Sequence, residues 1–164
     1  GDRVCIDTCS LMGPGEGALV GNSSRTLFLV HAETLDNPYV SPRPFRINAG
    51  AVHAYVRIPG GGTRYLSELE AGDEILGVNA QGRAMTLPVG RVKIERRPLL
   101  LVEAEGPMGA GTIICQNAET IRFVNSMDES VSVVTLKAGD EVLGSVDDGA
   151  RHFGHKIQET ITEK

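Results

Sequence analysis

The chain has 164 residues, of which 41% are hydrophobic and 4% aromatic, and its formal net charge is −5. This length and composition predict a soluble globular protein with one sizeable core or two small, closely packed subdomains. The acidic balance excludes the basic surface expected of a nucleic-acid-binding protein. No apolar run approaches the length of a membrane span, so we expect no membrane partner.

The cysteines indicate a reducing environment. Cys5, Cys9 and Cys115 cannot all pair in disulfides, and no signal peptide is visible. Reduced thiols and a cytoplasmic location are the expectation. No base is evident near Cys5 or Cys9 in the sequence, so we expect core thiols there rather than nucleophiles. The chain starts without Met, which leads us to expect further sequence upstream.

In chain order, the pattern is one of short strands rich in Val, Ile and Leu, bounded by Gly, Pro, Asn or Asp. We expect strands over Arg3–Cys9, Thr26–Glu33, Phe45–Ile58, Glu74–Asn79, Gly90–Glu95, Leu99–Glu105, Thr112–Gln116, Thr120–Asn125, Val131–Leu136 and Glu141–Val146. Hairpin turns are expected at Gly60–Gly62 and Asp147–Gly149. Helix is limited to a turn or two at Tyr65–Leu69 and in the tail from His155. The fold class is therefore mainly β, an internally duplicated barrel-like or sandwich-like domain with little helix.

The chain also repeats itself. Arg25–Glu33 recurs with most positions identical as Arg97–Glu105, and Leu-x-Ala-Gly-Asp-Glu-(Ile/Val)-Leu-Gly occurs at 69–77 and at 136–144. A period of about 70 residues indicates one copied structural unit rather than a short solenoid repeat. We expect pseudo-repeats at 1–71 and 72–138 and a partial third unit at 139–164. In each Gly-Asp element, Gly should supply an unusual backbone angle and Asp a side-chain hydrogen bond of the turn.

The two copies differ at the end of the repeated strand. His31 and Glu33 are two residues apart and should share one strand face, whereas the second copy has Glu103 and Glu105 there. An imidazole and a carboxylate in this arrangement can bind one divalent ion, so they form a candidate metal half-site. The alternative is a strand end with solvated charges.

An insert at 34–44 follows in the first copy only, and polar residues come directly after it. Arg43 and Arg46 could hold a carboxylate or phosphate, with Asn48 on the same strand face as Arg46. The alternative is that the two arginines pair with nearby Asp or Glu side chains.

Three residues are candidate acids or bases. His53 and Tyr55 should share a strand face, although His53 could instead be a hydrogen-bonded, partly buried histidine. Gly13–Ala18 matches the letters of a dinucleotide fingerprint, but the residues after it do not predict a helix, so a pyrophosphate site is not expected. A glycine loop that presents Glu16 as a ligand or an acid/base is favoured over the fingerprint, with a plain turn as the alternative.

Long motifs resemble one family over the whole chain. They are Asp7-Thr-Cys-Ser-Leu-Met, Pro14-Gly-Glu-Gly, Phe28-Leu-Val-His-Ala-Glu, Arg43-Pro-Phe-Arg-Ile-Asn-Ala-Gly, His53-Ala-Tyr, Thr63-Arg-Tyr-Leu-Ser-Glu-Leu, Val92-Lys-Ile-Glu-Arg-Arg-Pro, Gln116-Asn-Ala-Glu-Thr-Ile-Arg and Arg151-His-Phe-Gly. The chain resembles the C-terminal part of 3-dehydroquinate synthase type II, a family that also contains 3-amino-4-hydroxybenzoate synthases. The resemblance implies a C-terminal β-rich domain over 1–164 of a longer enzyme, with a missing N-terminal half as its partner.

The resemblance further implies a small-molecule substrate, an aminated deoxy seven-carbon keto acid. One branch of the family forms 3-dehydroquinate with NAD-linked oxidative deamination, and NAD is then expected mainly on the missing half. The other branch forms 3-amino-4-hydroxybenzoate without redox change, using a divalent metal such as Mn or Mg. The metal would be held by His31 and Glu33, with His53 or Glu16 as further ligands. A third alternative is a non-catalytic β scaffold or oligomerisation half, and a homo-oligomer remains open.

Overall fold

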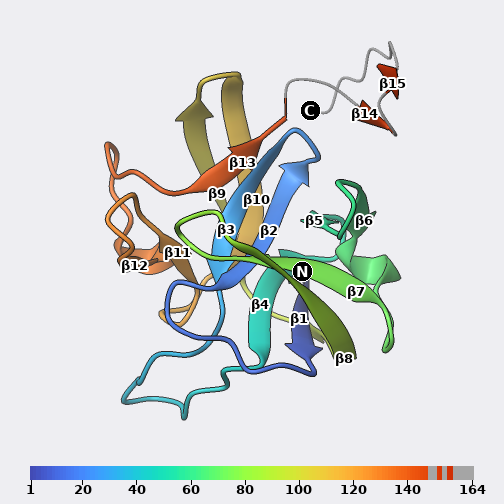
Figure 1. Ribbon diagram of the computed structural model, residues 1–164. Coiled ribbons are helices and arrows are strands. Elements are labelled where there is room, and N and C mark those ends of the chain that lie inside the picture. Colours follow the sequence, from blue (N-terminus) through green and yellow to red (C-terminus); the bar gives the residue numbers. More distant parts are fainter. Residues whose placement is uncertain (148–150, 153–154, 157–164) are drawn as a thin grey trace.

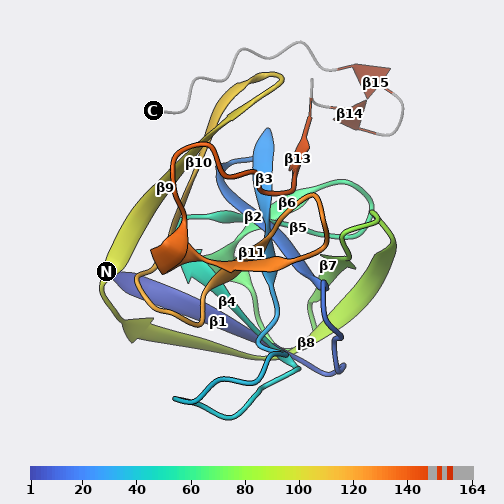
Figure 2. The same ribbon diagram turned by 90° about the vertical axis from the view of Figure 1, so that its left-hand side faces the viewer.

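The computed structural model describes residues 1–147 and the backbone of Arg151–His152 and His155–Lys156. An antiparallel sheet of 11 strands curls into a half-barrel (Figures 1 and 2), and its hydrogen-bonded order is β12-β11-β3-β2-β7-β8-β1-β4. Strand β13 pairs with β3, and β5 pairs with β2 and β6. The strands are β1 (Asp2–Thr8), β2 (Gly17–Ser23), β3 (Thr26–His31), β4 (Arg46–Ala51), β5 (Tyr55–Arg57), β6 (Thr63–Tyr65), β7 (Glu74–Val78), β8 (Ala84–Arg96), β9 (Leu99–Gly106), β10 (Gly109–Gln116), β11 (Arg122–Val124), β12 (Ser130–Ser132), β13 (Gly144–Val146), β14 (Arg151–His152) and β15 (His155–Lys156).

The expected mainly β fold with little helix is confirmed. The helical residues of the described chain form two single 3-10 turns, η1 (Leu66–Glu68) and η2 (Val133–Thr135), so the helical turn expected near Tyr65–Leu69 is present. No helix within the described residues is long and apolar enough to cross a membrane.

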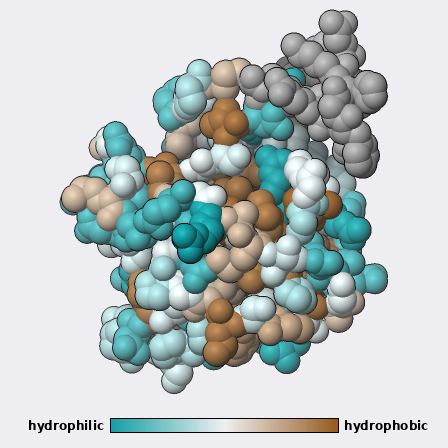
Figure 3. All heavy atoms as spheres, in the orientation of Figure 1, coloured by the Kyte–Doolittle hydropathy of each residue, from teal (hydrophilic) through white to brown (hydrophobic). Residues whose placement is uncertain are grey.

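The core lies inside the curl of the large sheet. Strands β1 to β4 carry continuous runs of buried residues because the hairpin β9–β10, a separate two-stranded sheet, packs its β10 strand against β2 and β4. Ile113 and Cys115 of β10 are fully buried there, and the rings of Phe28 and Phe123 lie 5.7 Å apart between centroids. On the face seen in Figure 3, apolar residues form a band bordered by hydrophilic ones.

The two copies have the same local structure around their 3-10 turns. Each turn follows a three-residue strand. The backbone N–H that opens η1 donates to Ala54 O and the one that opens η2 donates to Ile121 O, both at 2.8 Å. The repeated sequence therefore folds twice into the same strand-turn unit.

The Gly-Asp elements also match, as expected from the sequence. Gly72 has a φ of 95° and Gly139 a φ of 96°. In each copy an Oδ2 atom, from Asp73 or Asp140, accepts a hydrogen bond at 2.9 Å from the backbone N–H three residues earlier. These elements are turns that shape the scaffold. Most of the third unit beyond residue 147, with the turn at Asp147–Gly149 and the tail, lies outside the described residues.

Three expected strands are wrong in part. Val131–Leu136 leaves the strand conformation after Ser132, where the 3-10 turn η2 begins, because the Val133 N–H turns to Ile121 O. Glu141–Val146 is a strand only from Gly144, where pairing with β3 begins. Phe45–Ile58 is not continuous but divides into β4 and β5, because a turn closed by the Ala54 N–H to Ala51 O bond separates them. Gly50 precedes the turn with a φ of 132°, and a Cβ there would lie 2.7 Å from Ile114 O. Close approach of β10 thus requires glycine at this point, and the chain changes direction after it.

Strand β2 was missing from the strands expected from the sequence. It follows Gly13–Ala18 directly and is buried over most of its length, so the expectation that no helix follows this glycine segment is confirmed. Its glycines make the segment look like a loop in the sequence, but close packing requires them: a Cβ at Gly17 would overlap Val30 O, and one at Gly21 would overlap Thr26 O.

The expectation of a core thiol at Cys9 is also wrong. Cys9 is exposed because β1 ends at Thr8, whereas Cys5 is a buried free thiol as expected.

The two Gly-Asp turns should respond alike to the loss of glycine. We expect Gly72→Ala and Gly139→Ala each to lower the free energy of unfolding by about 1–3 kcal/mol, since an L-residue is strained at this φ. A Cβ at either site meets no atom within 4 Å, so the cost would be backbone strain alone. Gly62→Ala is the control, because its φ is ordinary and its nearest contact is 3.5 Å. Urea denaturation would measure all three, and equal stability of Gly72→Ala and Gly62→Ala would contradict the expectation.

Candidate functional site

A buried carboxylate links three strands at one end of the molecule. Asp7 of β1 is 3% exposed. It accepts hydrogen bonds from Arg46 of β4, with Nε at 2.7 Å and Nη2 at 3.0 Å, and from Nε of Arg91 of β8 at 2.8 Å. Burial alone would raise the pKa of Asp7, but the hydrogen bonds from the two guanidinium groups outweigh it and hold the pKa below its usual value. The alternative of ion pairing is thus correct for Arg46.

A second buried polar group lies beside this ion pair. Oε1 of Gln116 accepts a hydrogen bond from Nη1 of Arg3 at 2.7 Å and from Nδ2 of Asn48 at 2.9 Å. Arg3 also lies 3.4 Å from a carboxylate oxygen of Glu95. Asn48 therefore helps to organise the interior of this end of the sheet.

The insert at 34–44 closes as a loop on the backbone of Glu33. Glu33 N–H donates to Arg46 O at 2.8 Å, and Arg43 N–H donates to Glu33 O at 2.7 Å. The insert therefore leaves and rejoins the sheet at one place, directly beside the ion pair of Arg46.

The side chain of Glu33 is nearly buried, with 15% of it exposed. Burial raises its pKa above the usual value, and the nearby charges of Arg46, Arg43 and Arg3 only partly oppose the rise. The ion pair with Arg43 spans 3.9 Å, which is too long for a hydrogen bond. Glu33 is therefore a carboxyl group that can exchange a proton closer to neutrality than an exposed one.

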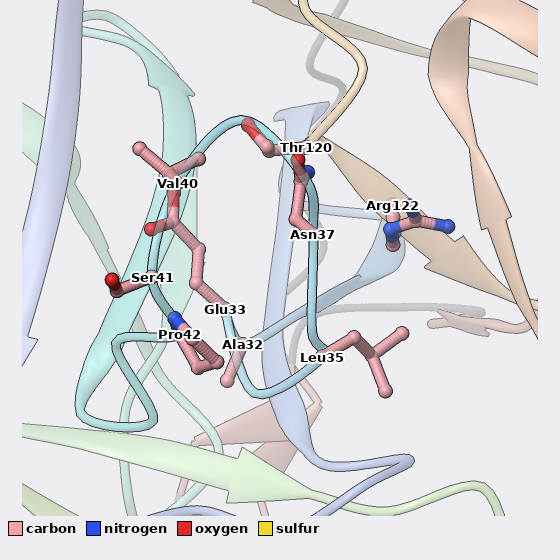
Figure 4. Close-up of a pocket in the computed structure, with 9 residues that line it drawn as sticks. All are labelled: Ala32, Glu33, Leu35, Asn37, Val40, Ser41, Pro42, Thr120 and Arg122. Atoms are coloured by element: carbon pink, nitrogen blue, oxygen red, sulfur yellow. The ribbon is translucent and has the colours of Figure 1, made fainter.

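Glu33 lines a small pocket under the insert (Figure 4). Residues 35–42 arch over it, Glu33 extends beneath the arch, and Thr120 and Arg122 complete the lining on the side of Asn37. The pocket volume is about 20 Å³, which is room for roughly one or two water-sized groups. Within the described residues, no hydrogen bond or ion pair engages the guanidinium of Arg122. The pocket fits one small anionic group of a larger ligand.

Three buried polar atoms at this end have no hydrogen-bond partner among the described residues. They are Arg3 Nε, Thr34 Oγ1 and Asn48 Oδ1. Thr34 follows Glu33 in the chain, and Arg3 is close enough to influence the pKa of Glu33. Such groups are rare in proteins because each costs desolvation free energy. None of the three lines the pocket of Glu33, so they mark strain in the interior beside it and are not groups that a ligand in the pocket would meet.

His31 is engaged on both ring nitrogens. Its Nε2 accepts a hydrogen bond from Gly15 N–H at 2.8 Å, and its Nδ1 lies 2.5 Å from Ala32 O. These partners require the tautomer with hydrogen on Nδ1. Burial lowers the pKa of His31, and the charge of Arg122 lowers it further, so the ring is neutral near pH 7. Neither nitrogen offers a free lone pair to a metal ion.

The structure does not bring the other proposed metal ligands to His31. The ring of His31 lies by Gly15, whereas the carboxylate of Glu33 lies by Arg43. Glu16 turns its Oε1 back to Gly13 N–H at 2.8 Å and so closes its own loop. No group of three or more His, Cys, Asp or Glu side chains in the described part of the chain is arranged to hold a metal. The residues do not fit a resident metal in this conformation, and the metal half-site stays a prediction.

The glycine segment does not fit a dinucleotide phosphate either. It leads into β2 rather than a helix, and the Glu16 carboxylate already takes the Gly13 N–H that a phosphate would need.

His53 and Tyr55 lie at the opposite end of β2 from Glu33. The register places His31 opposite Gly17 and Tyr55 opposite Gly21, four residues along the strand, or roughly 13 Å. Nε2 of His53 lies 2.9 Å from an Asn22 oxygen, and the ring of Tyr55 stacks on that of Tyr65 at 4.9 Å. The expectation that His53 could join His31 and Glu33 in one site is wrong, because the turn after Gly50 redirects the chain and places His53 beside Asn22, at the far end of β2.

Comparison with known proteins then identifies the family. A model of the 3-dehydroquinate synthase II C-terminal domain matches residues 1–164. The chain belongs to the 3-dehydroquinate synthase II family. A 3-dehydroquinate synthase of Methanospirillum hungatei is 62% identical over 164 residues, which cover 100% of this chain and 50% of the relative. That of Methanocaldococcus jannaschii is 62% identical over 164 residues, covering 100% and 45%. That of Methanococcus aeolicus is 63% identical over 166 residues, covering 100% and 46%. No solved structure matches.

The chain spans about half the length of the curated relatives it matches. Its site includes residues that the sequence pattern did not single out, namely Asp7, Arg91 and Arg122. An Asp inside an apolar strand and an Arg at the start of one were the available signals, since a charge in such a position needs a partner.

The neutral state of His31 gives a pH-dependent stability. Its pKa in the folded state is below the 6.5 of an ordinary histidine. The unfolded chain thus binds this proton more readily, so stability should fall as the pH drops from 7 through 6.5 toward the folded-state pKa.

We expect His31→Leu to cost about 2–5 kcal/mol, because it leaves Gly15 N–H and Ala32 O unpaired in the interior. His31→Gln should fold and lose the pH-dependent part of the stability between pH 7 and pH 5.5. Urea titrations at several pH values would measure both, and an unchanged slope in His31→Gln would contradict the assignment.

Proposed function

We propose that this chain is the site-bearing C-terminal domain of a 3-dehydroquinate synthase. The whole enzyme would cyclise an aminated deoxy seven-carbon keto acid to 3-dehydroquinate, with NAD-linked oxidative removal of the amine. The observation that carries the proposal is the pocket under the insert, where the nearly buried carboxyl group of Glu33, with its raised pKa, and the guanidinium of Arg122 line one cavity. The relatives at about 60% identity bear the name 3-dehydroquinate synthase, which supports the reaction.

Each residue of the site has a role in this proposal. Arg122 binds the substrate carboxylate in the pocket, since its cation lines the cavity and no other described residue forms an ion pair with it. Glu33 takes a proton from the carbon next to the substrate carbonyl, as its raised pKa suits a general base. Arg43, partly exposed and 3.9 Å from the Glu33 carboxylate, adds positive charge that stabilises the developing enolate.

Asp7 and Arg46 act differently. Their two hydrogen bonds fix the guanidinium, and the backbone oxygen of Arg46 then holds Glu33 N–H. They are positioning residues, because the guanidinium of Arg46 already donates two hydrogen bonds to Asp7 and so does not bind the substrate. NAD would supply hydride acceptance when bound, and no described residue of this chain is assigned to it.

Substitutions in the full-length enzyme test these roles. We expect Glu33→Gln to lower kcat by about 10²–10⁴ because it removes the base. Arg122→Gln should raise KM about 10–100-fold with a smaller change in kcat, since a charged hydrogen bond is worth about 1.5–3 kcal/mol. Glu68→Gln and Arg83→Gln, both exposed and far from the pocket in sequence, are controls. Unchanged turnover in Glu33→Gln would favour the alternative of a non-catalytic β scaffold.

The pH profile gives a second readout. Only the carboxylate of Glu33 can accept a proton, so kcat should fall as the pH drops through its raised pKa. The residual activity of Glu33→Gln should lack this acid limb.

The 3-amino-4-hydroxybenzoate branch remains the competing enzymatic alternative. It needs a divalent metal, and the engaged nitrogens of His31 do not favour one here. A product assay of the full-length enzyme with NAD and metal varied separately decides between them. We expect 3-dehydroquinate, strict NAD dependence and a rate unchanged by chelators; an aminohydroxybenzoate product made without NAD would overturn the proposal.

A further inference from the structure

The outer edge of β9 is an unpaired strand edge of eight residues. Among the described residues, strand β9 pairs with β10 alone, in a register that places Leu99 opposite Gln116 and Gly106 opposite Gly109. In an antiparallel pair every second residue turns its N–H and C=O outward, so the edge presents about four donors and four acceptors. No backbone hydrogen bond joins this edge to another strand in the described part of the chain. Such an edge is a template for a further strand.

A groove of about 850 Å³ runs along this edge. One wall is Leu100–Glu105 of β9 and the other is the second Gly-Asp element with the residues after it, 136–143. Figure 2 shows β9 and the segment between η2 and β13 side by side. Leu101 is 60% exposed on β9. The groove is thus lined by apolar and charged side chains together, and it is bordered by a backbone edge that no other strand of the described residues pairs with.

The first copy shows what fills the equivalent place. There β8 crosses the Gly-Asp turn, with Gly72 N–H donating to Val89 O at 2.8 Å and Val89 N–H donating to Asp73 O at 2.7 Å. Around Gly139 and Asp140 the turn is the same, but within the described residues no strand crosses it. The shape of the groove therefore suits one extended strand.

The charges that line the groove indicate which side chains a bound strand would carry. Four carboxylates border it, from Glu103, Glu105, Asp140 and Glu141, against one cation, Lys137. An extended segment that alternates apolar and basic side chains complements this lining.

We propose that the groove binds a strand of the N-terminal half of the same protein, which adds to the free edge of β9. The relatives carry about as many residues again as this chain spans, which is ample to supply one strand. The eight-residue edge of β9, with the groove beside it, offers such a strand both backbone partners and a lined channel.

Photo-crosslinking in the full-length enzyme tests the proposal. We place p-benzoylphenylalanine at position 103, in the groove, and at position 68, in η1 directly before the first Gly-Asp element, as control. We expect a crosslink from position 103, but not from position 68, to a peptide of the N-terminal half of the same chain. A crosslink to residues 148–164, a crosslink to a second copy, or no crosslink from position 103 would overturn the proposal.

Amide hydrogen exchange gives a matched second readout. In the full-length enzyme, Glu103→Lys with Glu105→Lys should speed exchange of the β9 amides about tenfold or more, while β10 amides stay protected. Glu68→Lys with Glu70→Lys makes the same charge change at exposed sites and should leave β9 unchanged. Equal exchange in both variants would count against the groove. Neither readout requires turnover, so they stand apart from the test of Glu33.

Discussion

The site depends on the buried carboxylate of Asp7. It is the point where β1 is joined through side chains to β4 on one side and β8 on the other, and so the point where the first and second sequence copies meet. A buried ion pair stabilises only when its hydrogen bonds offset the desolvation of the charges, and here both oxygens are engaged by guanidinium groups. With Arg46 fixed, its backbone oxygen holds Glu33, and Glu33 anchors both ends of the insert. The position of the pocket therefore follows from one ion-paired side chain.

The internal repeat helps to explain why the candidate site lies at one end of the molecule. The two copies share the strand-turn unit and the Gly-Asp turn down to the same hydrogen-bond lengths, and those elements build the sheet. The insert exists only in the first copy, and together with Thr120 and Arg122 it encloses a cavity beside the nearly buried carboxyl group of Glu33. Both copies thus contain the turns that build the sheet, whereas the pocket depends on the insert at 34–44, which the second copy lacks.

How far the sequence could predict this structure depended on the kind of interaction. Alternation and turn residues located most strands and both Gly-Asp turns, because those signals are local. Strand β2 was missed since its glycines, required by close backbone contacts, resemble a loop. The sequence predicts one strand that carries both Arg46 and, on its other face, His53 and Tyr55, because no local signal marks the turn between β4 and β5. The partners of Asp7 lie 39 and 84 residues away, so no local pattern could reveal that Arg46 and Arg91 share one carboxylate.

The pocket and the groove are connected through one short segment. Thr120 and Arg122 line the pocket, and Ser126, two residues after the end of β11, lines the groove. Between them Phe123 pairs with Val30, the residue before His31, so the segment is held against the strand that leads to Glu33. A pocket with room for one small group leaves most of a seven-carbon substrate outside it. If a strand binds in the groove as proposed, it lies against the residues that follow β11, and the two proposals are then linked, because Arg122 at the start of β11 is the residue proposed to hold the substrate carboxylate.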